Sequence, residues 1–146
     1  MANVVPYAFP VELLSGTHNF ASDTFKLALY TAPPYTTAST VYDATSETTR
    51  TEYSAGGNTL SGNAVSNSAN YATVDFTDSV WGSPTPATFS AAYGAIYNSS
   101  ASNKLVVILD FGGTKSCSNG TFTVTFPSPT SGSPTGADAL LSIKSN

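Results

Sequence analysis

The segment Lys104-Leu-Val-Val-Ile-Leu-Asp-Phe-Gly-Gly113 decides the fold class of this chain. Residues 105–109 are all apolar and mostly β-branched, and the run is too short for an average helix. Such a run predicts a strand whose two faces are both covered by the rest of the protein. We expect this strand to end at Asp110, because Gly112 and Gly113 permit a β-bulge or a tight bend.

The residues after this segment predict a turn and another strand rather than an active site. Apolar and polar residues alternate in Thr121-Phe-Thr-Val-Thr-Phe126, and Asn119-Gly120 before it favours a type I′ turn. A kinase would combine Asp110-Phe-Gly with a glycine-rich loop and a His-Arg-Asp motif, and the chain has neither. Cys117 lies nearly a hundred residues from the only histidine, His18, so a structural thiol is favoured over a nucleophile.

Further strands are predicted where apolar residues alternate between Gly, Pro and Asn residues. They cover residues 24–30, 53–60 as a hairpin-like pair, 71–76, 89–97 and 137–144. In residues 71–76 we expect Ala72, Val74 and Phe76 to face the core and Tyr71, Thr73 and Asp75 to face outward. Residues 36–53 carry the densest charge and are expected to form a long exposed excursion. About seven or eight strands without a convincing helix predict an all-β, single-domain antiparallel β-sandwich or jelly roll.

The N-terminal segment is predicted to be an extended arm. Residues 4–14 are largely apolar but contain two prolines, which disfavour both a helix and a central strand. We therefore expect residues 1–20 to form an arm or edge segment and residues 21–146 to form the β-sandwich domain.

Composition excludes several classes of function. The chain has 146 residues, of which only 10% are charged, and its net charge is -4, so it lacks the basic patch that nucleic-acid binding requires. It contains no apolar run long enough for a transmembrane helix. Its beginning lacks the features of a secretory signal, so we expect synthesis in a cytoplasm without an internal disulfide.

No catalytic, cofactor-binding or metal-binding residues are predicted. His18 has no neighbouring cysteine or second histidine, as a zinc site would need. Asp75 and Asp78 lack the run of oxygen ligands found in calcium loops. The chain has no Gly-x-Ser-x-Gly motif, and its acids are scattered, so neither a serine hydrolase nor a glycosidase is indicated.

Several short motifs in a fixed order are similar to a known family. The motifs are Ser22–Tyr30, Tyr53–Leu60, Val74–Trp81, Ala92–Asn98 and Leu109–Gly113. In this order they resemble a family of small β-rich virion structural proteins of tailed bacteriophages, from about residue 20 to the last predicted strand.

The resemblance implies a non-enzymatic virion protein that is made in the cytoplasm of the host bacterium and needs no cofactor. A capsid decoration, or cement, protein that stabilises the assembled head is the first interpretation. Its implied partners are the major capsid protein or another virion protein, together with further copies of itself, with a trimer favoured. A tail-associated or fibre-attachment role is the alternative.

The residues expected at an interface are mostly in the N-terminal segment. Large apolar and aromatic side chains are enriched in protein interfaces, which favours the arm and the single tryptophan. The candidates are Val4, Val5, Pro6, Tyr7, Phe9 and Trp81. We expect deletion of residues 1–14 to leave a folded domain that no longer assembles. A less favoured alternative is a carbohydrate-binding module in which Tyr93 and Tyr97 stack on sugar rings.

Overall fold

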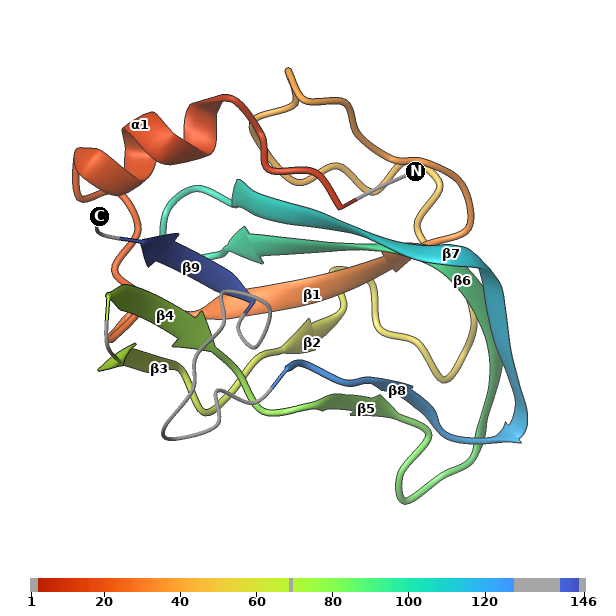
Figure 1. Ribbon diagram of the computed structural model, residues 1–146. Helices are drawn as coiled ribbons and strands as arrows, with labels where there is room; N and C mark the ends of the chain where they lie inside the picture. Colours follow the sequence, from red (N-terminus) through yellow and green to blue (C-terminus); the bar gives the residue numbers. More distant parts are fainter. Residues whose placement is uncertain (1–2, 69, 128–139, 145–146) are drawn as a thin grey trace.

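The protein is all-β, as the sequence predicts. A computed structural model describes residues 3–68, 70–127 and 140–144, and these contain nine strands and one short helix (Figure 1). The elements are α1 (Ala8–Leu14), β1 (Phe25–Tyr30), β2 (Asn58–Thr59), β3 (Ala64–Ser68), β4 (Tyr71–Asp75), β5 (Ser79–Trp81), β6 (Ala87–Asn98), β7 (Lys104–Gly120), β8 (Phe122–Val124) and β9 (Leu141–Lys144). Within the described ranges, α1 is too short to cross a membrane.

The strands form three antiparallel sheets. The largest has the order β2-β1-β6-β7, a second has the order β3-β4-β9, and the third is the pair β5-β8. Strands β6 and β7 pair over most of their length, and Figure 1 shows this long pair bending at its right-hand end toward β5 and β8. Of the predicted segment 137–144, residues 137–139 lie outside the described residues.

The four-stranded sheet is covered on both faces. On one face, Phe25, Leu27 and Leu29 of β1 join a core that includes Trp81 and Phe122 from the β5-β8 pair. On the other face, a smaller cluster joins Tyr35, from the loop after β1, to side chains of β1, β6 and β7, namely Ala28, Tyr30, Ala95, Tyr97, Leu105 and Ile108. Residues 105–109 are all buried, so the expectation of a strand covered on both faces is confirmed.

The excursion at residues 36–53 is largely exposed, as predicted, but part of it folds against the sheet. Glu47, which is buried, accepts hydrogen bonds from the hydroxyl groups of Tyr42 and Tyr53 at 2.6 Å each. It also accepts one from the backbone N–H of Gly56 at 2.8 Å. Three donors compensate the carboxylate for its lost hydration, which explains how a charged segment can fold against the sheet.

The glycine pair forms a β-bulge, as predicted. In the β6-β7 register Tyr93 lies opposite Asp110 and Ala91 lies opposite Lys115, so residues 111–114 face Ala92 alone. Gly112 and Gly113 both take positive φ. The strand continues beyond the bulge to Gly120, so the expectation that it ends at Asp110 is wrong; the bulge bends the strand without ending it.

The Asn-Gly pair does not make the predicted type I′ turn. Asn119 takes positive φ, but Gly120 does not, and both still belong to β7. The following strand, β8, pairs with β5 instead of folding back on β7. The dipeptide therefore marks the change from one sheet to another, which local sequence alone does not distinguish from a hairpin.

In β4, most side chains point to the side opposite to the one predicted. Thr73 and Asp75 are buried, whereas Ala72 is exposed and Val74 is half-buried. Alternation tells which residues share a face but not which face the fold covers. Thr73 is accommodated because its hydroxyl group lies 2.8 Å from that of Ser66 on β3.

The N-terminal segment is helical over residues 8–14, so the expectation of an extended arm is wrong there. Pro10 is the third residue of α1, and in the first turn of a helix the backbone N–H groups have no intrahelical partner. A proline at this place therefore breaks no helical hydrogen bond. Before the helix, Val4 exchanges two backbone hydrogen bonds with Ile108 of β7.

We predict that Gly57→Ala strongly destabilises the fold. Gly57 takes positive φ, and a Cβ added there would lie 1.8 Å from the carbonyl oxygen of Leu27 in β1. We expect a loss of more than about 3 kcal/mol in the free energy of unfolding, measured by urea denaturation with the fluorescence of Trp81. Gly112→Ala is the control, because its added Cβ meets nothing within 4 Å and only the positive φ, about 1–2 kcal/mol, is penalised. Equal losses in both variants would contradict this account.

Candidate interaction surface

Three large apolar side chains form a stripe on the outer side of α1. Tyr7, Val11 and Leu14 are 73%, 69% and 90% exposed. Their spacing of four and three residues places them on one side of a helix. We call these three residues the α1 stripe. Such a row of exposed apolar side chains is a candidate surface for contact with another molecule.

The opposite side of α1 is attached to the domain core. Phe9 is 3% exposed and lies against the rings of His18 and Phe20, with ring centroids 5.2 Å and 6.3 Å away. Gly16, with positive φ, ends the helix, and its N–H donates to the carbonyl oxygen of Leu13. The helix is therefore a packed part of the domain.

A buried carboxylate fixes α1 to the four-stranded sheet. Glu12 points inward, and its Oε1 accepts a hydrogen bond from Lys104 Nζ at 2.5 Å. Its Oε2 lies 3.2 Å from His18 Nε2. Lys104 is the first residue of β7, so this ion pair joins the helix to the edge of the sheet.

Asn98 determines how His18 is hydrogen-bonded. The Oδ1 of Asn98 accepts from the backbone N–H groups of Ser100 and Ala101, so its amide nitrogen faces Asp23 Oδ2 at 2.7 Å and His18 Nδ1 at 3.2 Å. Because an amide nitrogen only donates, His18 Nδ1 accepts. The proton on Nε2 is then donated to Glu12. The resulting chain of contacts leaves the α1 stripe on a firmly held element.

Asp23 completes this network at the surface. It accepts hydrogen bonds from the backbone N–H of Asn19 at 2.9 Å and from Asn98. These bonds, led by the one from Asn19, hold the pKa of Asp23 below its ordinary value.

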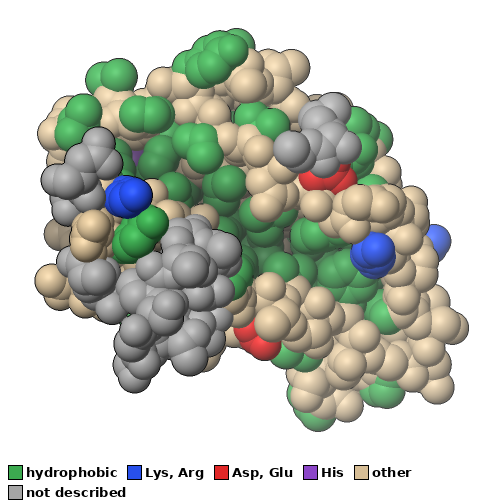
Figure 2. Space-filling view, in the orientation of Figure 1, with side chains coloured by type: hydrophobic (Ala, Val, Ile, Leu, Met, Phe, Trp, Pro, Cys, Tyr) green, Lys and Arg blue, Asp and Glu red, His purple; other side chains and the backbone are tan. Residues whose placement is uncertain are grey.

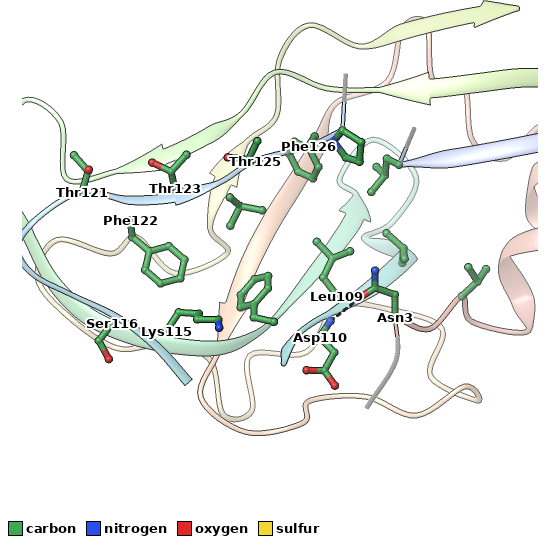
Figure 3. Close-up of a pocket in the computed structure, with 16 residues that line it drawn as sticks. Asn3, Leu109, Asp110, Lys115, Ser116, Thr121, Phe122, Thr123, Thr125 and Phe126 are labelled. Atoms are coloured by element: carbon green, nitrogen blue, oxygen red, sulfur yellow. Dashed lines mark hydrogen bonds between the residues drawn. The ribbon is translucent and has the colours of Figure 1, made fainter. Parts of the chain in front are cut away.

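A cleft of about 810 Å³ lies between β7 and β8. Its walls come from the inner faces of the two strands, including Leu109 and Phe111 from β7 and Phe122 and Phe126 from β8 and the residues after it. Figure 3 shows Phe122 pointing into this space, whereas Thr121 and Thr123 point away from it. Figure 2 shows the same apolar floor as a hollow near the middle of that face.

The cleft offers apolar surface but little chemistry. Asp110 and Lys115 are its charged lining residues, and the Asp110 N–H donates to Asn3 Oδ1 at 2.9 Å (Figure 3). The described lining residues include neither a histidine nor a cysteine.

The expected interface residues fall into two groups. Tyr7 and Val5 are exposed, and Val4 is half-buried next to β7. Pro6 and Phe9 are buried, so they support the fold and do not present a surface.

The hypothesis that Trp81 is a surface anchor is wrong. Trp81 is 4% exposed and packs against Tyr53, Phe89 and Phe122, with ring centroids 6.2–6.5 Å away. Its neighbour in sequence, Val80, is the side chain of β5 that faces outward. The sequence predicted no strand at residues 79–81, so it could not indicate which side of β5 is covered.

Three other residues considered from the sequence take part in contacts that support the fold. Tyr97 is buried and donates a hydrogen bond to the carbonyl oxygen of Gly56, so it cannot stack on a sugar ring as the carbohydrate hypothesis requires. Cys117 is half-buried, with its thiol 3.7 Å from the carbonyl oxygen of Phe89. Asp78 accepts a hydrogen bond from the backbone of Phe126. The described residues contain no group of three or more His, Cys, Asp or Glu side chains that could hold a metal ion.

Sequence reasoning missed Val11 and Leu14. The prolines at positions 6 and 10 argued against a helix, so the spacing of Tyr7, Val11 and Leu14 was not interpreted as a helical stripe. The signal that identifies them is this spacing together with the tolerance of the first helical turn for proline.

Comparison with known proteins gives no relative for this chain. No family model, curated protein or solved structure matches it.

We predict that Glu12→Gln weakens the attachment of α1. The amide group loses the charge that pairs with Lys104 and keeps only one acceptor oxygen for two donors. We expect a loss of about 1–3 kcal/mol in the free energy of unfolding, measured by urea denaturation. Glu52→Gln makes the same change at an exposed position, where we expect a change within about 0.5 kcal/mol. A Glu12→Gln variant as stable as Glu52→Gln would show that the buried network contributes nothing.

We predict opposite pH dependences for Asp23→Asn and Asp75→Asn. The lowered pKa of Asp23 means that its carboxylate stabilises the fold above the ordinary pKa, and this stability is lost as pH falls through the folded value. The stability of wild type relative to Asp23→Asn should therefore decrease as pH falls from about 6 to about 3.

Asp75 provides the comparison of opposite sign. Burial, reinforced by the nearby charge of Asp78, raises the pKa of Asp75, so its ionisation destabilises the fold as pH rises above the ordinary value. The stability of Asp75→Asn relative to wild type should therefore increase as pH rises from about 3 to about 6. Urea denaturation at several pH values measures both trends, and parallel curves for the three proteins would contradict the assignment.

Proposed function

We propose that this protein is a non-enzymatic structural subunit of a tailed-bacteriophage virion and that it decorates the assembled capsid. The observation that carries the proposal is the α1 stripe, whose side chains Tyr7, Val11 and Leu14 are held outward by a buried network on the other side of the helix. Exposed apolar rows of this kind are typical of surfaces that bind other proteins.

The motifs shared with phage virion proteins have structural roles in this fold. Residues 25–30 form the buried strand β1, Gly57 lies against the backbone of that strand, and residues 110–113 form the start of the bulge in β7. Motifs with such positions specify the fold and not an active site, which supports a subunit that contributes a surface to a particle. The partner in this proposal is the major capsid protein or another virion protein.

Localisation in intact particles tests the proposal directly. We expect mass spectrometry of purified particles of the encoding phage to detect the chain, and electron cryomicroscopy to show it in a regular pattern on the shell. Density at the tail vertex alone would support the tail-associated role and contradict decoration. A particle that lacks the chain would overturn both roles.

Substitutions in the α1 stripe test which surface makes the contact. Tyr7→Lys and Val11→Lys should fold normally, because both side chains are exposed, yet bind particles lacking the protein about tenfold more weakly than wild type. Val80→Lys is the matched control, since Val80 is an exposed valine on β5. Unchanged binding by both stripe variants would place the contact elsewhere.

Deletion of residues 1–14 is a poorer test than these substitutions. The deletion removes Phe9 from the core and Glu12 from the network with His18 and Lys104. Loss of assembly by the truncated chain would therefore reflect loss of stability as well as loss of the surface.

A further inference from the structure

A protruding side chain and an apolar groove lie next to each other at one end of the molecule. Leu14, at the C-terminal end of α1, is 90% exposed. Beside it, a groove of about 430 Å³ runs between the end of α1 and the sheet β3-β4-β9. Its apolar lining includes Leu13, Phe20, Val65, Val74, Leu141 and Ile143.

Both features belong to the same face. Figure 1 places the end of α1 next to β9, and Figure 2 shows apolar side chains gathered over α1 in the upper left of the same view. Val65 and Ile143 contribute to the groove from β3 and β9 and are 57% and 59% exposed. They lie on the same side of the sheet as Val74, because Val65 is opposite Val74 and Ile143 is opposite Ala72.

The groove contains no charge that would oppose an apolar occupant. Its described lining has no Asp, Glu, Lys or Arg, and both ring nitrogens of His18 are engaged by Glu12 and Asn98. Lys144 neighbours Ile143 in sequence but lies over the ring of Tyr71, with Nζ 6.0 Å from its centroid, on the other side of the sheet. The described lining of the groove would therefore bring no like charges together between two copies.

We propose that the occupant of this groove is Leu14 of a second copy of the chain. An interface with two-fold symmetry joins the same patch of both subunits, so it must contain a feature and its complement side by side. Leu14 and the groove satisfy this condition, and each copy would bury its Leu14 against Val65 and Ile143 of the other.

This inference rests on the proposed function, because it names the first partner of the α1 stripe. It also replaces the expected trimer by a two-fold pair. A three-membered ring needs the protruding group and its acceptor on different sides of the subunit, whereas Leu14 and the groove lie together.

The mass of the purified full chain in solution is the first test. Light scattering and sedimentation equilibrium should give twice the mass of one chain at about 100 µM, with dissociation on dilution. Leu14→Glu and Ile143→Lys should each give a single-chain mass at the same concentration. Val41→Lys and Val80→Lys alter exposed valines that do not line the groove and should keep the double mass.

Mixing the two monomeric variants tests the proposed pairing itself. In a mixed pair, Glu at position 14 of one copy meets Lys at position 143 of the other, and the second contact keeps the natural Leu14 and Ile143. We expect the mixture to recover the double mass, whereas neither variant does so alone. Circular dichroism and thermal melting confirm that each variant is folded.

Three outcomes would overturn the inference. These are a single-chain wild type at 100 µM, a triple mass, and a mixture that remains monomeric. None of them depends on whether the chain is found in phage particles. A dimer missing from particles would instead overturn the proposed function and leave the pairing intact.

Discussion

Strands β1 and β7 carry apolar side chains on both faces, and most of the remaining structure serves to cover them. The β5-β8 pair covers one face with Trp81 and Phe122. Among the described residues, no second sheet packs on the other face. Irregular segments cover it instead, including Val4 near the N-terminus and Tyr35 in the loop after β1. Burial of apolar surface drives this arrangement, but it forces loop segments to fold against a sheet with their polar groups satisfied.

Two buried carboxylates hold segments that pack around the four-stranded sheet. Glu47 accepts three hydrogen bonds and holds the excursion, whereas Glu12 pairs with Lys104 and His18 and holds α1. A buried charge without such donors would cost more than the cover could contribute. Each carboxylate therefore gives its segment one defined position. The same network fixes Asn98, which ties the end of β6 to the loop at Asp23.

Much of the fold was predictable because it depends on local patterns. The run at residues 105–109 and the glycines at 112–113 correctly predicted a doubly covered strand and a bulge. The facing of Thr73 and the choice between core and interface for Trp81 could not be predicted, because each depends on which distant segment covers that side of a strand. The helix α1 was missed because its prolines argue against a helix, although Pro10 lies in the first turn. The apolar composition of the N-terminal segment suggested an interface there, and Tyr7 is indeed exposed. Val11 and Leu14 could be identified as exposed only once the segment was known to be helical.

Helix α1 carries apolar side chains on its outer side as well as on its inner side. Its acid, Glu12, faces inward, and Tyr7, Val11 and Leu14 face water. A helix selected only for the stability of this domain would gain from polar side chains at the three outer positions. Stability of the isolated chain therefore does not account for them. The buried network holds the helix in place regardless of what covers its outer side, so the apolar positions are free to be selected for contact with another subunit.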